Sequence, residues 1–244
     1  MNAAEAYARL RAVGRPLLSS AEAGIAWGQE ESATTQALRR LAETGLVQRV
    51  RKGLWAVEDI VDPLDVAHFL TRPYPSYGST WTALFRHGLI EQIPRSIYVV
   101  SLDRAQTIPT SVGQFVVHHI HPDLYGGMER SGWHDLATPE KALFDTVYLL
   151  GAQHGRDVRL PEVTLPWSFD DQIVDGWIQR IPSKRLQTLT RTAVGRVLGG
   201  AERERPRPPA SPTGPLAPGG FTVSEMSGVR STHARRVRVS GLER

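Results

Sequence analysis

The chain contains no cysteine among its 244 residues. Disulfide bonds, thiolate nucleophiles and cysteine-ligated zinc sites are therefore excluded. Long apolar runs are absent too: no stretch approaches the roughly 20 apolar residues that a membrane-spanning helix requires, and residues 1–10 lack the apolar region of a secretory signal. Because 41% of the residues are hydrophobic, the chain can fill a core. We expect a folded, cytoplasmic protein with no membrane partner.

Positive charge is unevenly distributed. The net charge is +4, but residues 201–244 alone carry eight arginines and four glutamates, which leaves the first 200 residues neutral. A second local excess lies in residues 32–57, where the only acidic residue is Glu43. The basic residues of that segment are Arg39, Arg40, Arg49, Arg51 and Lys52. A local excess of this kind is typical of proteins that bind nucleic acid.

Three helices are predicted near the N-terminus. Residues 3–13 have an apolar stripe and are followed by a loop, and residues 20–27 form a short helix with Ser20 as its N-cap and a turn at Gly28. Residues 31–44 form the third helix. Its inward-facing residues, Thr34, Leu38 and Leu41, follow a helical spacing.

A hairpin is predicted to follow these helices. Residues 46–50 and 54–57 are strand-like, and Gly53 supplies the positive φ that a tight turn needs. Helices and hairpin together predict a winged helix-turn-helix domain over residues 1–60, which binds double-stranded DNA. We expect that DNA to be the protein's own promoter, with inverted repeats on which the protein self-associates.

The predicted DNA-binding side chains lie on the outer face of the third helix and on the hairpin. Glutamine and arginine on such a helix can read base edges, and basic residues on a wing suit phosphates or a narrow minor groove. The predicted set is Ser32, Thr35, Gln36, Arg39, Arg40, Arg49, Arg51 and Lys52. Two alternatives are that these residues only solvate an amphipathic helix, or that the domain makes protein contacts.

The remaining residues predict an α+β fold in two parts. Residues 61–200 form a mixed α/β domain with a small sheet and C-terminal helices, and residues 201–244 form a disordered tail rich in arginine and proline. In the second domain, strands are predicted at 96–102 and 113–121, and helices at 79–87, 138–151, 170–181 and 183–198. We interpret the tail as a solvated terminus, with phosphate contacts by Arg235, Arg236 and Arg238 as the alternative.

Two segments of the second domain resemble the AbiEi family of antitoxins. They are residues 77–94, YGSTWTALFRHGLIEQIP, with the strand 97–101, and residues 137–145, ATPEKALFD. The resemblance implies a repressor that autoregulates its operon and counters an AbiEii-like nucleotidyltransferase toxin in a type IV toxin-antitoxin, or abortive-infection, system of phage defence. It covers about residues 5–155, so toxin neutralisation has less support than DNA binding.

The Pro-Glu-Lys helix start has a structural interpretation that needs no chemistry. Glu140 lies where a helix dipole favours an acid, and Lys141 precedes Asp145 by four residues, so the two form a helical ion pair of a few tenths of a kcal/mol. A partner-binding role is the alternative.

No catalytic motif or cofactor site is recognised. The one metal-like cluster is His118, His119 and His121, with His134 and Asp135 further on. On a strand, His119 and His121 would share a face while His118 points away, so we interpret all three as ordinary strand histidines and predict no metal. Two other functions stay open: a stand-alone regulator whose second domain senses a ligand or dimerises, and a metal-dependent nuclease.

Overall fold

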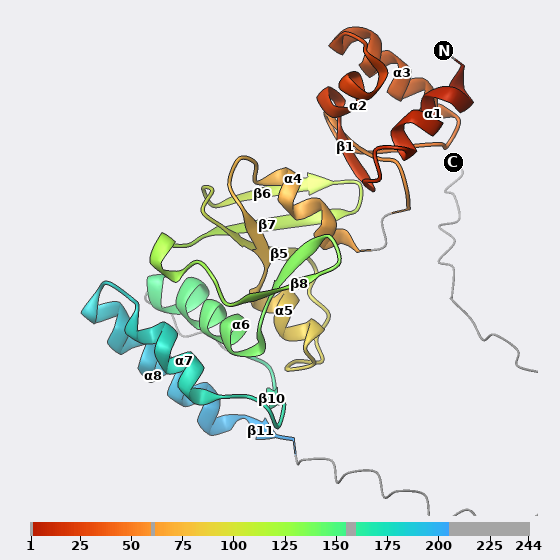
Figure 1. The fold of residues 1–244 in the computed structure, drawn as a ribbon. Coiled ribbons are helices and arrows are strands. Elements are labelled where there is room, and N and C mark those ends of the chain that lie inside the picture. Colours follow the sequence, from red (N-terminus) through yellow and green to blue (C-terminus); the bar gives the residue numbers. More distant parts are fainter. Residues whose placement is uncertain (1, 60–61, 155–159, 205–244) are drawn as a thin grey trace, which may run out of the picture. The chain divides into compact units, whose positions relative to one another are not determined.

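The computed structural model describes residues 2–59, 62–154 and 160–204, which form a mixture of helices and several sheets (Figure 1). The disordered tail predicted from residue 201 is wrong in its first residues, because Glu202–Arg203 form a strand paired with Thr164–Leu165. From residue 205 onward, the predicted tail lies outside the described residues. The N-terminal elements are α1 (Ala3–Arg11), β1 (Leu17–Ser19), α2 (Ser20–Trp27), α3 (Glu31–Glu43), β2 (Gln48–Arg51) and β3 (Leu54–Ala56).

Helices and a hairpin lie where the sequence predicts them, but the loop after α1 contains a strand. β1 pairs antiparallel with β3, so the three strands form a sheet in the order β1-β3-β2. A three-residue strand is too short for its alternation to be recognised in a sequence. The N-cap of α2 is Ser19, not the predicted Ser20: Ser19 and Glu22 form a reciprocal capping box. The Ser20 hydroxyl instead accepts a hydrogen bond from Trp55 Nε1 at 2.9 Å.

A six-stranded mixed sheet forms the centre of the second part. Its order is β6-β7-β5-β4-β9-β8, with β5/β7 and β4/β9 parallel and the other pairs antiparallel. The elements are η1 (Pro63–Val66), α4 (Ala67–Leu70), β4 (Ser76–Gly78), α5 (Thr80–Arg86), β5 (Ile97–Ser101), β6 (Gln106–Thr110), β7 (Gly113–His119), η2 (Pro122–Leu124), β8 (Met128–Ser131) and β9 (His134–Ala137).

The sheet is larger than predicted. Strands β5 and β7, rich in β-branched residues, were predicted, but β4, β6, β8 and β9 were not. β8 is mostly exposed, and β6 contains a proline at the sheet edge. Such short or polar strands carry no hydrophobic alternation, so only pairing with a neighbour reveals them.

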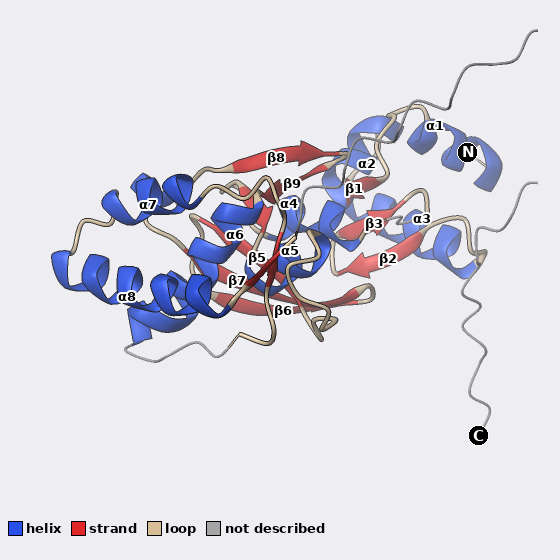
Figure 2. Cartoon of the chain, turned by 90° about the horizontal axis from the view of Figure 1, so that it is seen from below, coloured by secondary structure: helices blue, strands red, loops and turns tan. Residues whose placement is uncertain are grey.

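Helices complete the second part beyond the sheet. α6 (Pro139–Asp145) continues as a π-helical turn, η3 (Thr146–Gly151), where a single α-helix was predicted. The predicted C-terminal helices are confirmed, and Figure 2 shows them beside α6. The remaining elements are η4 (Ala152–His154), β10 (Thr164–Leu165), α7 (Asp171–Gln179), α8 (Lys184–Gly200) and β11 (Glu202–Arg203). None of the helices in the described ranges has both the length and the apolar character needed to span a membrane.

One hydrophobic cluster joins the N-terminal sheet to the six-stranded sheet. Leu17, Val50 and Leu54 share this cluster with Leu64 and Phe115, all of them buried. The carbonyl of Val50 also accepts a hydrogen bond from the backbone of Ser111, in the turn between β6 and β7, at 3.0 Å. The end of β2 that precedes the hairpin turn is therefore fixed to the β6–β7 turn of the second sheet.

Candidate nucleic-acid interface

One face of helix α3 packs into the protein, and the opposite face is exposed to solvent. Thr34, Leu38 and Leu41 are buried, as the sequence predicts. The Thr34 hydroxyl donates to the carbonyl of Glu30 at 2.8 Å, which anchors the start of the helix. On α2, a Cβ atom built on Gly24 would lie 3.2 Å from Thr34 Oγ1, so the glycine allows the two helices to approach closely.

The outward face of α3 carries the predicted polar side chains. Ser32, Gln36, Arg39 and Arg40 are exposed, and Thr35 is half-buried. Because the inner stripe fixes the rotation of the helix, these side chains are presented together on one side. The structure thus brings together all five positions that the sequence assigned to this helix.

The β2–β3 hairpin presents the other three predicted side chains. Arg49, Arg51 and Lys52 are exposed, and Gly53 adopts φ +80° at the turn. An irregularity in the strand pairing separates Arg49 from Arg51. The Arg49 guanidinium lies 5.9 Å from the ring centre of Trp55, whose indole is buried, so the charged end of this arginine lies over the hairpin.

The basic residues predicted to bind DNA form no ion pair with a described residue. Elsewhere in residues 2–59 the arginines are paired: Arg9 with Glu5, Arg11 with Glu58 and Arg15 with Glu22, at 2.8, 3.2 and 3.3 Å. Among residues 2–59, the basic side chains that have no ion pair with any described residue are Arg39, Arg40, Arg49, Arg51 and Lys52. The free positive charge of this part of the chain is therefore confined to α3 and the hairpin.

Two exposed carboxylates border this surface. Glu30 and Glu31 lie at the N-terminal end of α3, where they interact favourably with the helix dipole but repel phosphates. A DNA backbone would consequently approach nearer to Arg39 and Arg40 than to the first residues of the helix.

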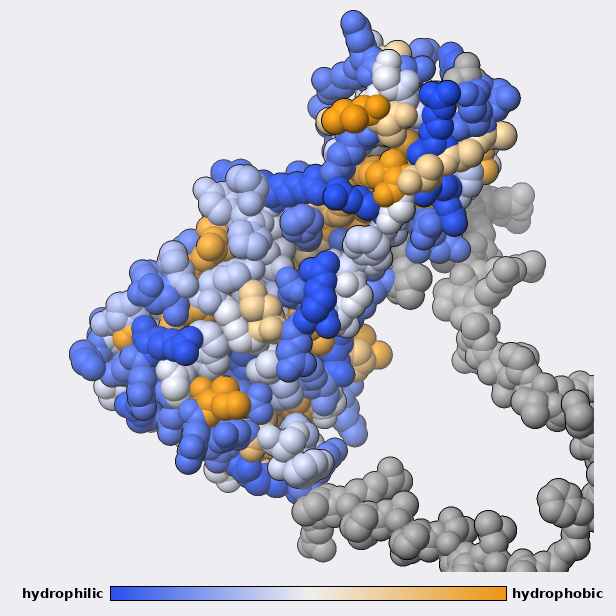
Figure 3. All heavy atoms as spheres, in the orientation of Figure 1, coloured by the Kyte–Doolittle hydropathy of each residue, from blue (hydrophilic) through white to orange (hydrophobic). Residues whose placement is uncertain are grey.

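Figure 3 shows a mostly hydrophilic face on which hydrophobic residues form small separate areas.

The histidines of the metal-like cluster in the sequence do not come together in the structure. β7 ends at His119, two residues earlier than predicted, and His121 instead caps the 3₁₀-helix η2, where its Nδ1 accepts from the Asp123 amide. His118 stacks on Tyr98, and burial lowers its pKa. The exposed His119 lies 3.0 Å from the Asp103 carbonyl. Within the described ranges, no three His, Asp or Glu side chains are placed to hold a metal ion.

The Lys141–Asp145 pair is buried, whereas the sequence suggested an ordinary surface pair. Both side chains are completely inaccessible, and Asp145 also accepts hydrogen bonds from Tyr77 at 3.0 Å and Ser79 at 2.7 Å. The helical spacing was right, but its environment depends on β4, which the sequence did not reveal. The value of a few tenths of a kcal/mol therefore does not apply here.

Comparison with known protein families and with characterised proteins found no match for this chain.

Proposed function

We propose that this protein is a DNA-binding transcriptional repressor that serves as the antitoxin of a type IV toxin-antitoxin system. In this proposal residues 1–60 are a winged helix-turn-helix, with α3 in the major groove and the β2–β3 hairpin as the wing. The protein would repress its own operon and counter an AbiEii-like nucleotidyltransferase toxin. The observation that carries the proposal is that, within residues 2–59, the basic side chains without an ion pair to any described residue all lie on α3 and the hairpin.

Electrostatics and geometry support the same assignment. Arg39 and Gln36 have the donor patterns that match guanine and adenine edges, and each bidentate pair discriminates by about 1–3 kcal/mol. Arg51 and Lys52, at the tip of the hairpin, suit phosphates, since a wing reaches the backbone beside the groove. Val50, next to the hairpin turn, accepts a hydrogen bond from Ser111, so the wing is held against the β6–β7 turn.

The antitoxin part of the proposal rests on the two family-like segments. They are separated by more than forty residues, yet Tyr77 and Ser79 of the first donate hydrogen bonds to Asp145 of the second. The similar residues thus meet in one buried structural unit, which is consistent with a fold shared with AbiEi proteins. Toxin binding itself is inferred only from the resemblance.

The decisive experiment is a mobility shift of the full chain on its own upstream DNA and on a random duplex, at several salt concentrations. We expect the Arg39→Ala/Arg40→Ala variant to lose tenfold or more of the promoter preference, since it removes base-reading groups. The Arg51→Ala/Lys52→Ala variant should weaken both complexes and lower the salt slope by about 1 for each lost phosphate contact.

A matched control keeps this test specific. The Arg95→Ala/Arg104→Ala variant removes two exposed arginines of the second part and should bind as the wild type does. Failure of the wild type to bind either duplex at low salt would refute the proposal. In cells, co-expression of the Arg39→Ala/Arg40→Ala variant with the toxin encoded beside it should still restore growth, because neutralisation is assigned to residues 61–200.

A further inference from the structure

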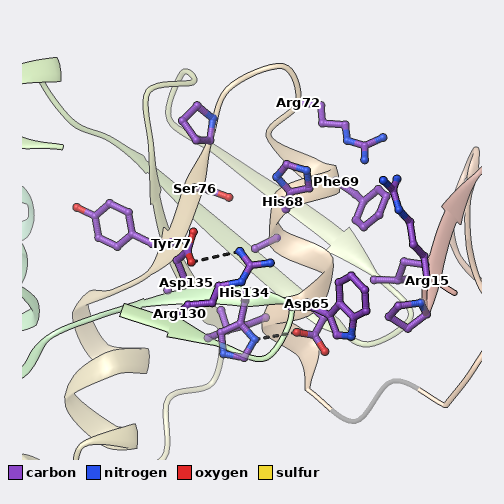
Figure 4. A pocket seen from close by; sticks show the side chains of 17 residues that line it. Arg15, Asp65, His68, Phe69, Arg72, Ser76, Tyr77, Arg130, His134 and Asp135 are labelled. Atoms are coloured by element: carbon purple, nitrogen blue, oxygen red, sulfur yellow. Dashed lines mark hydrogen bonds and ion pairs between the residues drawn. The ribbon is translucent and has the colours of Figure 1, made fainter. Parts of the chain in front are cut away.

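A cavity of about 390 Å³ lies away from α3 and from the hairpin tip (Figure 4). It is lined by the segment before β1, by α4 with the turn that follows it, and by the β8–β9 hairpin. This volume lies within the range of small-molecule sites. None of the residues predicted to bind DNA lines it.

Three guanidinium groups surround the cavity. Arg15 and Arg72 both approach the Glu22 carboxylate, at 3.3 and 3.2 Å, and Arg130 lies 3.2 Å from Asp135. Between 38% and 60% of each arginine side chain stays exposed. Because a guanidinium has five N–H donors, these contacts leave donors free for a ligand.

The positive charges of these three arginines all act on His68, which lines the cavity. The pKa of His68 is lowered, first by partial burial and then by the positive charges of Arg72, Arg130 and Arg15; Asp135 opposes them. The second carboxylate that lines the cavity, Asp65, is bound to the Nδ1 side of His134 at 2.8 Å. At His68 the positive charges of the three arginines therefore outweigh the negative charge of Asp135.

Aromatic and aliphatic groups complete the walls. Phe69 lies 4.3 Å beneath the Arg72 guanidinium, and Trp133, on the β8–β9 turn, is 52% exposed. Leu17 and Leu64 are buried behind them. The Tyr77 side chain points away from the cavity, and its hydroxyl donates to Asp145 (Figure 4). The cavity thus combines cationic donors with apolar faces.

We propose that this cavity binds a small organic anion composed of a phosphate or carboxylate and a planar ring. Arg15, Arg72 and Arg130 would hold the anionic group, because guanidinium pairs bidentately with both. Phe69 and Trp133 would contact the ring through their faces. Nucleoside monophosphates and aromatic carboxylates share this chemistry and are the two sources to be distinguished.

A bound anion would also affect the N-terminal helices. It competes with Glu22 for Arg15 and Arg72, and Glu22 is part of the capping box of α2, which contacts α3. We therefore expect the ligand to change promoter affinity, a consequence that rests on the proposed function. The sequence offered no signal for this site, since Arg15, Arg72 and Arg130 are separated by more than fifty residues each.

Calorimetric titration of the full chain tests the cavity directly. The probes are AMP, GMP and salicylate, with inorganic phosphate and adenosine as ligands that lack one half of the chemistry. We expect one saturable site for at least one ring-bearing anion, and at least tenfold weaker binding of phosphate and adenosine. Binding of the nucleotides alone, or of salicylate alone, identifies the source.

Substitutions in the cavity test whether the ring-bearing anion binds there. Arg130→Gln and Trp133→Ala should each weaken binding tenfold or more, while Arg95→Gln, an exposed arginine outside the cavity, should not. The thermal midpoint of each variant shows that it is folded. No binding of any ring-bearing probe at millimolar concentration, or equal binding by folded variants and wild type, would overturn the proposal.

A mobility shift with the bound probe separates the two proposals. A changed promoter affinity supports the coupling, whereas an unchanged affinity refutes the coupling and leaves the cavity to calorimetry. Failure to bind the promoter, with and without the probe, refutes the proposed function alone.

Discussion

At the residue scale, the most unusual feature is the buried Lys141–Asp145 pair. Burial lowers the pKa of Lys141 and raises the pKa of Asp145, while their mutual attraction acts in the opposite direction. The ammonium also lies 4.6 Å from the ring centre of Trp177 and 4.9 Å from that of Phe144. Such a pair adds little net stability but is costly to break, because the remaining charge has no water around it.

Removing the lysine alone should therefore be severe. We expect Lys141→Met to lower the free energy of unfolding by about 3–5 kcal/mol, since Asp145 loses its counter-charge. In Lys141→Met/Asp145→Asn, an amide oxygen can still accept from Tyr77 and Ser79, so most of the loss should be recovered. Urea unfolding measures both. A double variant as unstable as the single one would contradict this account.

At the scale of elements, the turn between α2 and α3 depends on backbone conformation. Gly28 caps α2 with φ +64°, and its amide hydrogen-bonds back to Ile25. A Cβ atom at this position would meet no other atom within 4 Å, so a side chain there is penalised by the backbone angle alone. This turn sets the angle at which α3 leaves α2.

Substitutions at Gly28 should follow their tolerance of a positive φ. We expect Gly28→Ala to destabilise the fold by about 1–2 kcal/mol and Gly28→Asn by clearly less, because asparagine adopts the left-handed conformation more readily. Thermal or urea unfolding gives the comparison. Equal losses for alanine and asparagine would show that the backbone angle is not the cause.

At the scale of the whole molecule, the cluster around Phe115 makes the hairpin part of a larger core. Phe115 and Leu64, from the second part, are buried together with Val50 and Leu54 of the hairpin. A domain boundary near residue 60, predicted from the sequence, therefore lies beside packed contacts rather than in an independent linker.

A substitution that removes a large side chain from this cluster should destabilise both the hairpin and the six-stranded sheet. Phe115→Ala is expected to cost about 3–5 kcal/mol and to accelerate amide hydrogen exchange in β3 as well as in β7. Val174→Ala, in α7, removes a buried residue of the other cluster and should affect α7 more than β3. If exchange in β3 stayed at its wild-type rate in Phe115→Ala, the hairpin would be shown to be independent.

Local patterns in the sequence were sufficient for the helices and the charged surface. The spacing of Thr34, Leu38 and Leu41 predicted the buried face of α3, and exposure of Arg39 and Arg40 followed from it. Helical periodicity extends over several turns, so each residue repeats the same information. The five predicted residues of α3 consequently lie on its outer face, as the sequence placed them, while DNA binding stays a prediction.

Tertiary structure alone decided the pairing of short strands and the environment of charged groups. β4 and β9 meet across almost sixty residues, and this pairing brings Tyr77 and Ser79 onto Asp145. The cavity likewise is lined by Arg15, Arg72 and Arg130 only because the fold brings three distant segments of the chain to it. The physical reason is that burial and electrostatic surroundings depend on long-range contacts, whereas the sequence determined the local elements through periodicity, caps and turn residues.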